Sequence, residues 1–352
     1  MLRVILTLLA LSLTLSAGDR ASGYSVYRSE DHGRTWARSD TGLPGDSRIN
    51  AFTANRESLI AGTDGGIFTS GDSGKTWKKS SIMGSLTNAA HRVTSVAALH
   101  NTVFAGTSEG AVLSSEDNGN VWKLNPTFPR RIVRSLLAVE GGLYLGTDAA
   151  GVYKTTDLGR TWIQLAAGLP ENAQGLALTA IDGRLFVGLY AKGLYTLNQP
   201  EQRWVQVGAA VQIKPLVLAS TGDTLIAGHN PGGIYWSDNL GQNWKHWTMA
   251  TAPGPTSDPD LFPSLDSILG ERSTRTLEPL QAPIWEMSAD SKIAIAGAGN
   301  GIYLSADQAH TWSRATAGLP PNAPGIAFLI QEDLILAAVH ERSSSCTEVK
   351  TK

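Results

Sequence analysis

The sequence predicts an all-β fold, a seven-bladed β-propeller whose blades are four-stranded antiparallel sheets. First, a segment that ends in tryptophan recurs at intervals of 40 to 45 residues over most of the chain. A period of that length is typical of stacked or radial repeat folds. Second, each repeat contains four short strand signals separated by turns rich in Gly, Asp and Asn, without helical periodicity. Third, the two ends of the chain carry complementary half-repeats.

The repeated segment that ends in tryptophan has the form Ser/Thr-x-Asp-x-Gly-x-Thr/Val-Trp in its four close copies. These copies contain Asp31, Gly33 and Trp36, then Asp72, Gly74 and Trp77, then Asp117, Gly119 and Trp122, then Asp157, Gly159 and Trp162. Two weaker copies contain Asn239 with Trp244 and Asp307 with Trp312. The unit around Trp204 has lost the pattern, so the repeat is read there from its strands alone.

The repeat also predicts the number of blades. In the first complete unit, strands are expected at Ile49–Ala54, Ser58–Thr63, Gly66–Ser70 and Thr76–Ser80. Six complete units are expected at 49–81, 93–126, 133–170, 175–210, 213–250 and 283–320. Gly325–His340 supplies the first two strands of one more blade, and Tyr24–Asp40 supplies its last two. Sharing a blade between the termini closes the ring and removes an exposed sheet edge.

Composition limits the classes of function. The chain has 352 residues with 29 Lys+Arg and 31 Asp+Glu, a formal net charge of −2. A chain this close to neutral has no global signature of nucleic-acid binding or of polybasic membrane association. Its one cysteine, Cys346, excludes an intrachain disulfide and a cysteine-based zinc site, and its histidines show no zinc-ligand spacing. We therefore expect no metal and no cofactor.

Residues 1–18 are expected to be a secretory signal peptide. Arg3 precedes an apolar run from Val4 to Leu15, and small residues follow the run. The run is shorter than the roughly 20 residues that a membrane-spanning helix needs. The mature protein, expected as one propeller over residues 19–341, would then be secreted or periplasmic, with no integral membrane segment after cleavage.

The repeated segment resembles the Asp-box, also called the BNR repeat, and the resemblance covers nearly the whole predicted domain. It implies that these residues are structural. The aspartate would accept backbone N–H bonds in the turn between strands three and four, the glycine would supply a positive φ, and the tryptophan would pack between blades. The alternative role, calcium binding, lacks the D-x-D-x-D-G series of ligands.

Function is expected on the face where connections between strands two and three and between successive blades surround the central channel. Candidate partner-binding residues at the entrances of the innermost strands are Arg48, Arg92, Arg130, Arg131, Arg134 and Lys214. They form either a solvated rim or a site for an anionic partner. Glu286 is the charged residue among the channel-facing positions eleven residues before the strand-two glycine. It is either a channel carboxylate or, as we expect, paired with a neighbouring arginine.

Two segments depart from the repeat. The insertion Thr251–Gln281 lengthens the connection into the last complete unit and should project over the same face. Loops this long are usually functional or disordered. Residues 342–352 fit no blade and are expected to form a C-terminal tail that contains Cys346.

Asp-box propellers include sialidases, xyloglucan-active glycoside hydrolases, sortilin-type receptors and photosystem II stability/assembly-factor proteins. The sequence lacks the Arg-Ile-Pro motif of sialidases and has length for one propeller, whereas xyloglucan-active enzymes carry two. Overall it is most similar to the single seven-bladed, secreted, assembly-factor-like group, which binds proteins through a basic patch. The resemblance implies a non-enzymatic propeller that binds an extracytoplasmic protein or peptide of acidic character.

The alternative is a sialidase-like or polysaccharide-active glycoside hydrolase with a carbohydrate ligand. Such an enzyme needs two facing carboxylates, or a Tyr–Glu pair, in the channel mouth. No second carboxylate accompanies Glu286 at the equivalent channel-facing positions of the other units.

Overall fold

The computed structural model describes residues 23–83, 92–139, 141–208, 215–229, 232–247 and 282–341, apart from the side chains of residues 215, 216 and 229. The predicted signal peptide, the Thr251–Gln281 insertion, Lys214 and the tail with Cys346 lie outside the described residues.

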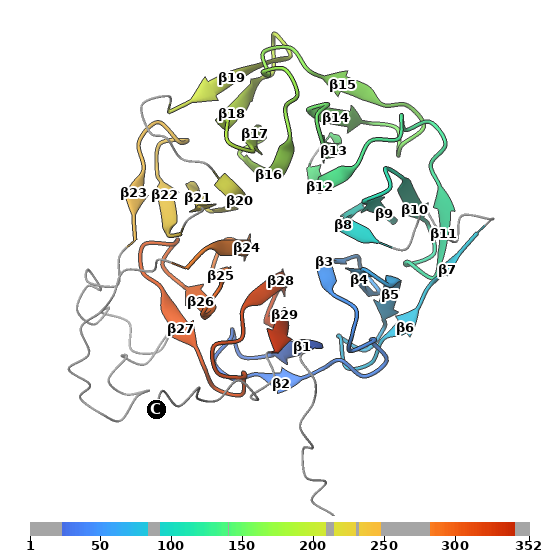
Figure 1. Cartoon of the computed structure of the whole chain (residues 1–352), viewed down its shortest axis with the longest axis vertical. Coiled ribbons are helices and arrows are strands. Elements are labelled where there is room, and N and C mark those ends of the chain that lie inside the picture. The colour runs from blue at the N-terminus through green and yellow to red at the C-terminus, as the bar shows by residue number, and fades with distance from the viewer. Residues whose placement is uncertain are drawn as a thin grey trace, which may run out of the picture.

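Seven antiparallel sheets surround a central axis, as the repeat predicts (Figure 1). The first three complete blades are β3 (Ile49–Ala54), β4 (Leu59–Thr63), β5 (Gly66–Ser70) and β6 (Lys78–Lys79); β8 (Val93–Leu99), β9 (Thr102–Thr107), β10 (Val112–Ser115) and β11 (Val121–Leu124); and β12 (Val133–Val139), β13 (Gly142–Thr147), β14 (Val152–Thr155) and β15 (Ile163–Leu165). The short β7 (Ser81–Ile82) adds a parallel strand outside β11.

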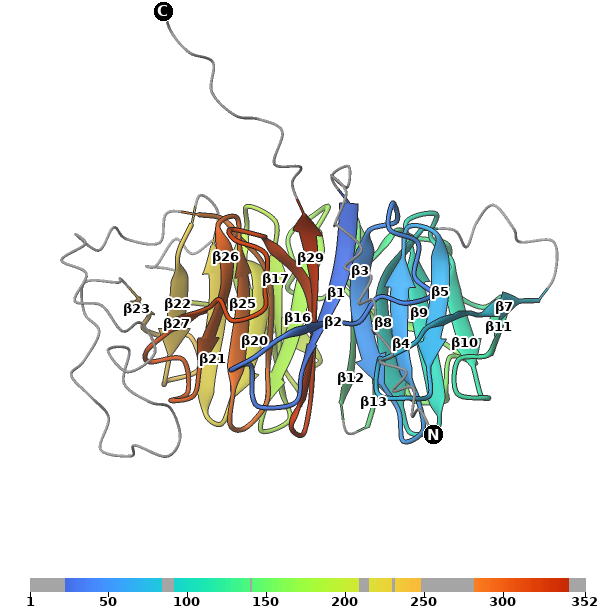
Figure 2. The same cartoon turned by 90° about the horizontal axis from the view of Figure 1, so that it is seen from below.

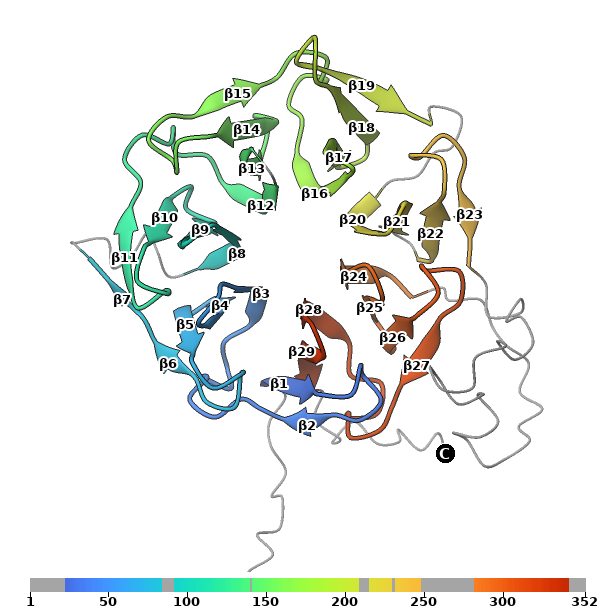
Figure 3. The ribbon, with the colours of Figure 1, turned by 180° about the vertical axis from the view of Figure 1, so that it is seen from behind.

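The next three blades have the same order from the axis outward. They are β16 (Gly175–Ile181), β17 (Arg184–Leu189), β18 (Gly193–Asn198) and β19 (Arg203–Val207); β20 (Pro215–Thr221), β21 (Thr224–His229), β22 (Ile234–Ser237) and β23 (Lys245–His246); and β24 (Ile284–Ala289), β25 (Ala294–Ala298), β26 (Gly301–Ser305) and β27 (Ser313–Ala315). Seen from the opposite side, the first strand of each blade again lines the axis (Figure 3).

Both ends of the chain build the seventh blade, which confirms the predicted closure. Its order is β2-β1-β29-β28, formed by β1 (Gly23–Ser29), β2 (Ala37–Arg38), β28 (Gly325–Gln331) and β29 (Leu334–Glu341). Strand β1 pairs antiparallel with β29 along its whole length (Figure 2). The Tyr27 hydroxyl also donates a hydrogen bond to Glu341 Oε1 at 2.9 Å. The first and last repeats are therefore joined by a continuous ladder.

The repeated turn between strands three and four is held by the side chains that the sequence pattern selects. Asp31 Oδ1 accepts the Thr35 backbone N–H at 2.9 Å, and Oδ2 accepts the Thr35 hydroxyl at 2.6 Å. Ser29 Oγ donates to Asp31 and accepts the N–H of Gly33, whose φ is +82°. The same carboxylate-to-backbone bond recurs at Asp72, Asp117, Asp157 and Asp307. A bound calcium ion is not needed to explain these aspartates.

Tryptophans of this turn pack between blades. Trp122 is fully buried with Ile60 and Ile67 of the preceding blade and with Val103 of its own blade. Its indole N–H donates to the Gly119 carbonyl at 2.8 Å. Trp36, Trp77 and Trp312 are also buried, whereas Trp162 and Trp244 are half-buried.

The glycine of strand two permits close packing of successive blades. A Cβ on Gly106 would lie 2.3 Å from Cγ1 of Val133, the first residue of the next innermost strand. A Cβ on Gly62 would similarly lie 2.6 Å from Cγ1 of Val93. Side chains larger than hydrogen at Gly62 and Gly106 would push these innermost strands apart, whereas the seventh blade has Ala338 at the equivalent position.

Deleting residues 325–352 should destabilise the whole ring, because it removes β28 and β29 and leaves β1 with an open edge. We expect the midpoint of thermal unfolding to fall by at least about 10 °C, or the protein to aggregate. A matched deletion of residues 342–352 keeps every described strand and should unfold at nearly the parent temperature. Equal stability of both deletions would contradict closure by a shared blade.

Asp72→Ala should lower the free energy of unfolding at pH 7 by about 1 kcal/mol, a value limited by solvent screening in this exposed turn. Hydrogen bonds from the Thr76 hydroxyl and backbone lower the pKa of Asp72 from 3.8 to about 2. A carboxylate with a lowered folded-state pKa stabilises the fold above its unfolded pKa and loses that effect as the pH falls through the folded value.

The difference between Asp72→Ala and the parent should therefore be constant above about pH 4 and vanish below about pH 2 in urea unfolding. Asp223→Ala, in the β20–β21 turn, is the control, since no hydrogen bond of the described residues involves its carboxylate. A difference that persists in strong acid would mean that the carboxylate bonds are not its cause.

Candidate functional site

One repeated backbone contact defines the mouth of the central channel. The first residue after strand two donates its N–H to the residue that precedes the innermost strand, as Asp64 does to the Arg48 carbonyl at 2.9 Å. Equivalent bonds join Ser108 to Arg92, Asp148 to Ile132, Tyr190 to Gln174 and Gly299 to Pro283. In the seventh blade the donor, His340, lies near the end of β29 and bonds to Pro324. The two sets of connections predicted to share a face do meet. We call this face the channel mouth.

Each innermost strand carries a β-bulge just inside the channel mouth. The pairing of β12 with β13 skips from Val133 to Ser135 and leaves Arg134 out of the ladder. The equivalent skipped residues are Asn50, Thr94, Leu176, Leu216, Trp285 and Ile326. Because a bulge redirects side chains, these positions do not follow strict strand alternation.

Five of the candidate arginines gather on three neighbouring blades of the channel mouth. Arg48 precedes β3, Arg92 precedes β8, and Arg130 and Arg131 precede β12, on which Arg134 lies. Strands β3, β8 and β12 follow one another around the ring (Figure 1). The structure therefore brings these five residues to one sector, which we call the arginine sector.

Ion pairs neutralise part of the arginine sector. Arg92 Nε lies 3.1 Å from Asp64 Oδ1, and Arg134 Nη2 lies 2.9 Å from Asp148 Oδ2. Among the described residues, no ion pair involves the remaining arginines of the sector, Arg48, Arg130 and Arg131, and the latter two are exposed. Asp46 and Glu109 lie in connections of the same face and also form no ion pair among the described residues, so the sector keeps a small excess of positive charge.

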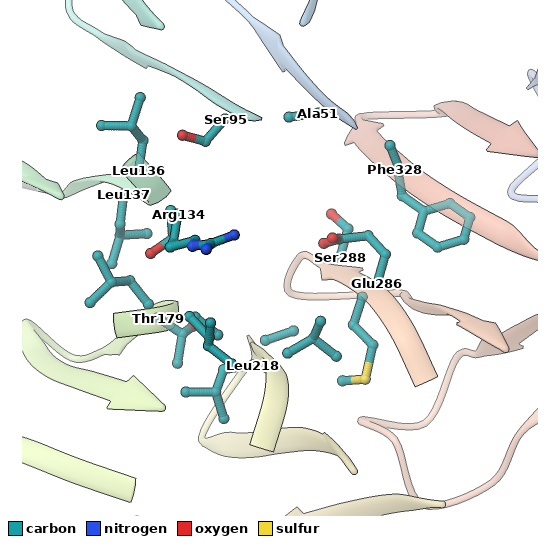
Figure 4. Close-up of a pocket in the computed structure, with 18 of the residues that line it drawn as sticks. Ala51, Ser95, Arg134, Leu136, Leu137, Thr179, Leu218, Glu286, Ser288 and Phe328 are labelled. Carbon is teal, nitrogen blue, oxygen red and sulfur yellow. The ribbon is translucent and has the colours of Figure 1, made fainter. Parts of the chain in front are cut away.

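A cavity of about 420 Å³ occupies the channel between the innermost strands (Figure 4). Of the described residues that line it, Arg134 and Glu286 are the charged ones. They come from β12 and β24, on opposite sides of the ring, and both point into the cavity (Figure 4). Much of the remaining wall is aliphatic, with serine and threonine hydroxyls between the aliphatic groups.

Glu286 does not form the expected ion pair with an arginine. Among the described residues, no arginine or lysine nitrogen lies within 4.0 Å of its carboxylate. Burial raises the pKa of Glu286 from 4.5 to about 7, while the Met287 backbone and the Arg48 guanidinium act in the opposite direction. Arg48 is thus close enough to influence the carboxylate without contacting it. Close to neutral pH, a large fraction of Glu286 is protonated.

Two exposed aromatic side chains belong to the channel mouth. Trp285, the bulge residue beside Glu286, is 39% exposed, and Tyr190, in the turn after β17, is 57% exposed. Trp, Tyr and Arg are the residues most enriched among binding hot spots. Reading the sequence missed Trp285. It could have been found by aligning the seven units at the position twelve residues before the strand-two glycine.

Within the described ranges, no group of three or more His, Cys, Asp or Glu residues is placed to hold a metal ion. The same part of the chain contains no helix long and apolar enough to cross a membrane.

Comparison with known proteins supports the fold. A sequence profile of the DUF6242 beta propeller domain matches residues 61–173, and no curated protein sequence matches the chain. A structure of YCF48 bound to a D1 peptide is 15% identical and has a TM-score of 0.60, covering 86% of this chain and 100% of that one. The resemblance is one of fold.

Two further structures have the same architecture. YCF48 from Cyanidioschyzon merolae is 13% identical with a TM-score of 0.61, over 86% of this chain and 97% of that one. The GH74 xyloglucanase from Xanthomonas campestris is 16% identical with a TM-score of 0.57, over 90% of this chain and 56% of the enzyme. A propeller fold hosts unrelated functions, so the function depends on the residues of the channel mouth rather than on the fold.

Proposed function

We propose that this protein is a non-enzymatic, extracytoplasmic propeller that binds an acidic protein or peptide at the channel mouth. The observation that carries the proposal is the unbalanced charge of the arginine sector. Arg48, Arg130 and Arg131 have no ion-pair partner among the described residues, and acidic groups of a partner would supply the missing charges.

Three further features support a macromolecular partner. Trp285 and Tyr190 offer exposed aromatic surface on the same face as the arginines. In the ring, β16 follows β12, so the blade of Tyr190 adjoins the arginine sector. YCF48, which shares the fold, has been observed with a bound peptide. By this resemblance, the protein would assist the assembly or stability of its partner.

The glycosidase alternative has less support from the site. Hydrolysis of a glycoside commonly uses two carboxyl groups that flank the scissile bond. Of the described residues lining the cavity, Glu286 is the single carboxylic acid, and the facing wall carries Arg134. The likeness to a xyloglucanase concerns the fold and does not supply the second group.

Replacing Arg48, Arg130 and Arg131 together by glutamine should weaken binding of a fluorescent hexaglutamate peptide at least tenfold. It should also flatten the salt dependence, because screened attraction to those charges would be lost. Fluorescence anisotropy at 50 and 300 mM salt measures both effects. Arg92 and Arg134 are kept because their ion pairs hold neighbouring turns.

The matched control replaces three exposed arginines at the opposite ends of the strands by glutamine. They are Arg56 and Arg160, which lie in turns, and Arg184, the first residue of β17. This variant has the same net charge as the first and should bind like the parent. Equal loss in both variants would reduce the effect to net charge, and the channel mouth would then not be the binding surface.

A further inference from the structure

The layer of side chains around Glu286 leaves room for a ligand. The third residue of each innermost strand pairs with the glycine of strand two, or with Ala338 in the seventh blade. Together these third residues form one layer around the channel. The layer consists of Ala51, Ser95, Ser135, Ala177, Val217, Glu286 and Ala327. Glu286 is the one long side chain among small ones, and it extends into the open cavity (Figure 4).

Hydrogen-bonding groups near this layer lack partners. The buried Nε of Arg48 and the buried Oγ of Ser95 have no hydrogen-bond partner among the residues that the structure describes. Glu286 forms no ion pair with a described residue, although Arg48 is close enough to act on its charge. Buried polar groups normally have partners, and exceptions call for an explanation. A ligand that accepts hydrogen bonds would explain why these groups have no partner within the protein.

The charges that face Glu286 favour an anionic ligand. Strands β20, β25 and β28 pack around β24 and contain no titratable residue, and β21 contains one, His229, at its end. Arg134 of β12 faces Glu286 across the cavity, and Arg48 also acts on its carboxyl group. A protonated carboxyl group can donate a hydrogen bond to a carboxylate, whereas an ionised one would repel it.

The wall formed by β12, β16 and β20 is suited to hydrocarbon. Leu136, Leu137, Leu178 and Leu218, from β12, β16 and β20, line the cavity. β20 is the neighbour of β24, so this aliphatic wall begins next to the strand of Glu286. Cavities that combine an apolar wall with a few polar groups are typical of small-ligand sites.

We propose that the cavity binds an aliphatic carboxylate, whose oxygens accept hydrogen bonds from the protonated Glu286 and from Arg134, the arginine that lines the cavity opposite it, while its hydrocarbon body lies against the leucines. Arg48, at the channel mouth outside this lining, adds positive charge near the site. The inference deepens the proposed function, on which it rests, because a free chain end of a bound peptide has this chemistry. A small aliphatic acid has it too. In either case Glu286 takes up a proton from solvent as the anion binds.

Calorimetric titration of the full-length protein with N-acetyl-leucine at pH 6 and pH 8 tests this proposal. The ligand carboxylate is ionised at both values because its pKa lies near 3.5. Affinity should be about tenfold higher at pH 6, since the protonated fraction of Glu286 falls about tenfold across this range. N-acetyl-leucinamide, which lacks the charge, should bind much more weakly.

Two variants separate the roles of the donors. Glu286→Gln keeps a donor that does not titrate, so binding should persist with equal affinity at both pH values. Arg134→Gln should reduce affinity at least tenfold, and Arg56→Gln, on the opposite face, should leave it unchanged. 4-Methylpentanoate distinguishes the sources: equal affinity favours free small acids, and weaker binding favours a peptide chain end.

Tighter binding of isoamylamine than of N-acetyl-leucine, with affinity rising from pH 6 to pH 8, would overturn the proposal by making Glu286 a cation site. Absence of carboxylate binding at both pH values would also overturn it. If hexaglutamate binding to the channel mouth persists in that case, this inference alone fails and the proposed function stands.

Discussion

The ring depends on close contact between the innermost strands of neighbouring blades, and in six blades the second strand also packs against the first strand of the next blade. At Gly106 this contact leaves no space for a side chain, because a Cβ would lie 2.3 Å from Val133. A contact repeated between neighbours closes a ring only if the last blade also meets the first. The N- and C-terminal strands meet this requirement by sharing one sheet, in which β1 pairs with β29. The channel and its mouth exist only because the ring is closed.

The same geometry separates structural from binding residues. Turns between strands three and four are occupied by their own hydrogen bonds, as at Asp72 and Asp157, and their tryptophans are used for packing between blades. On the other face, the innermost strands begin with a bulge, and their side chains are free to point toward the channel. Side chains at the channel mouth can therefore differ from blade to blade without disturbing the repeated turns. The uneven distribution of charge around the channel mouth agrees with this.

The repeat made the fold largely predictable from the sequence. The tryptophan period located the blades, the half-repeats predicted the shared blade, and the position of Gly62 in each unit aligned Arg48 with its equivalents. The bulges were not predictable from alternation, so Trp285 was missed. The pairing of Arg92 with Asp64 and the isolation of Glu286 were also missed, because both depend on distances between blades rather than on spacing along the chain. Identical residue types at equivalent positions can thus be paired or free.

The central claim is that the channel mouth, rather than the opposite face, recognises an acidic partner. Hydrogen–deuterium exchange with and without hexaglutamate tests it most directly, because it maps protection on the parent protein without any substitution. We expect slower exchange at residues 45–48, 64–66, 107–110 and 129–132, and no change in the turns at 31–35, 72–76 and 157–161. Protection confined to the latter turns, with none at the channel mouth, would contradict it.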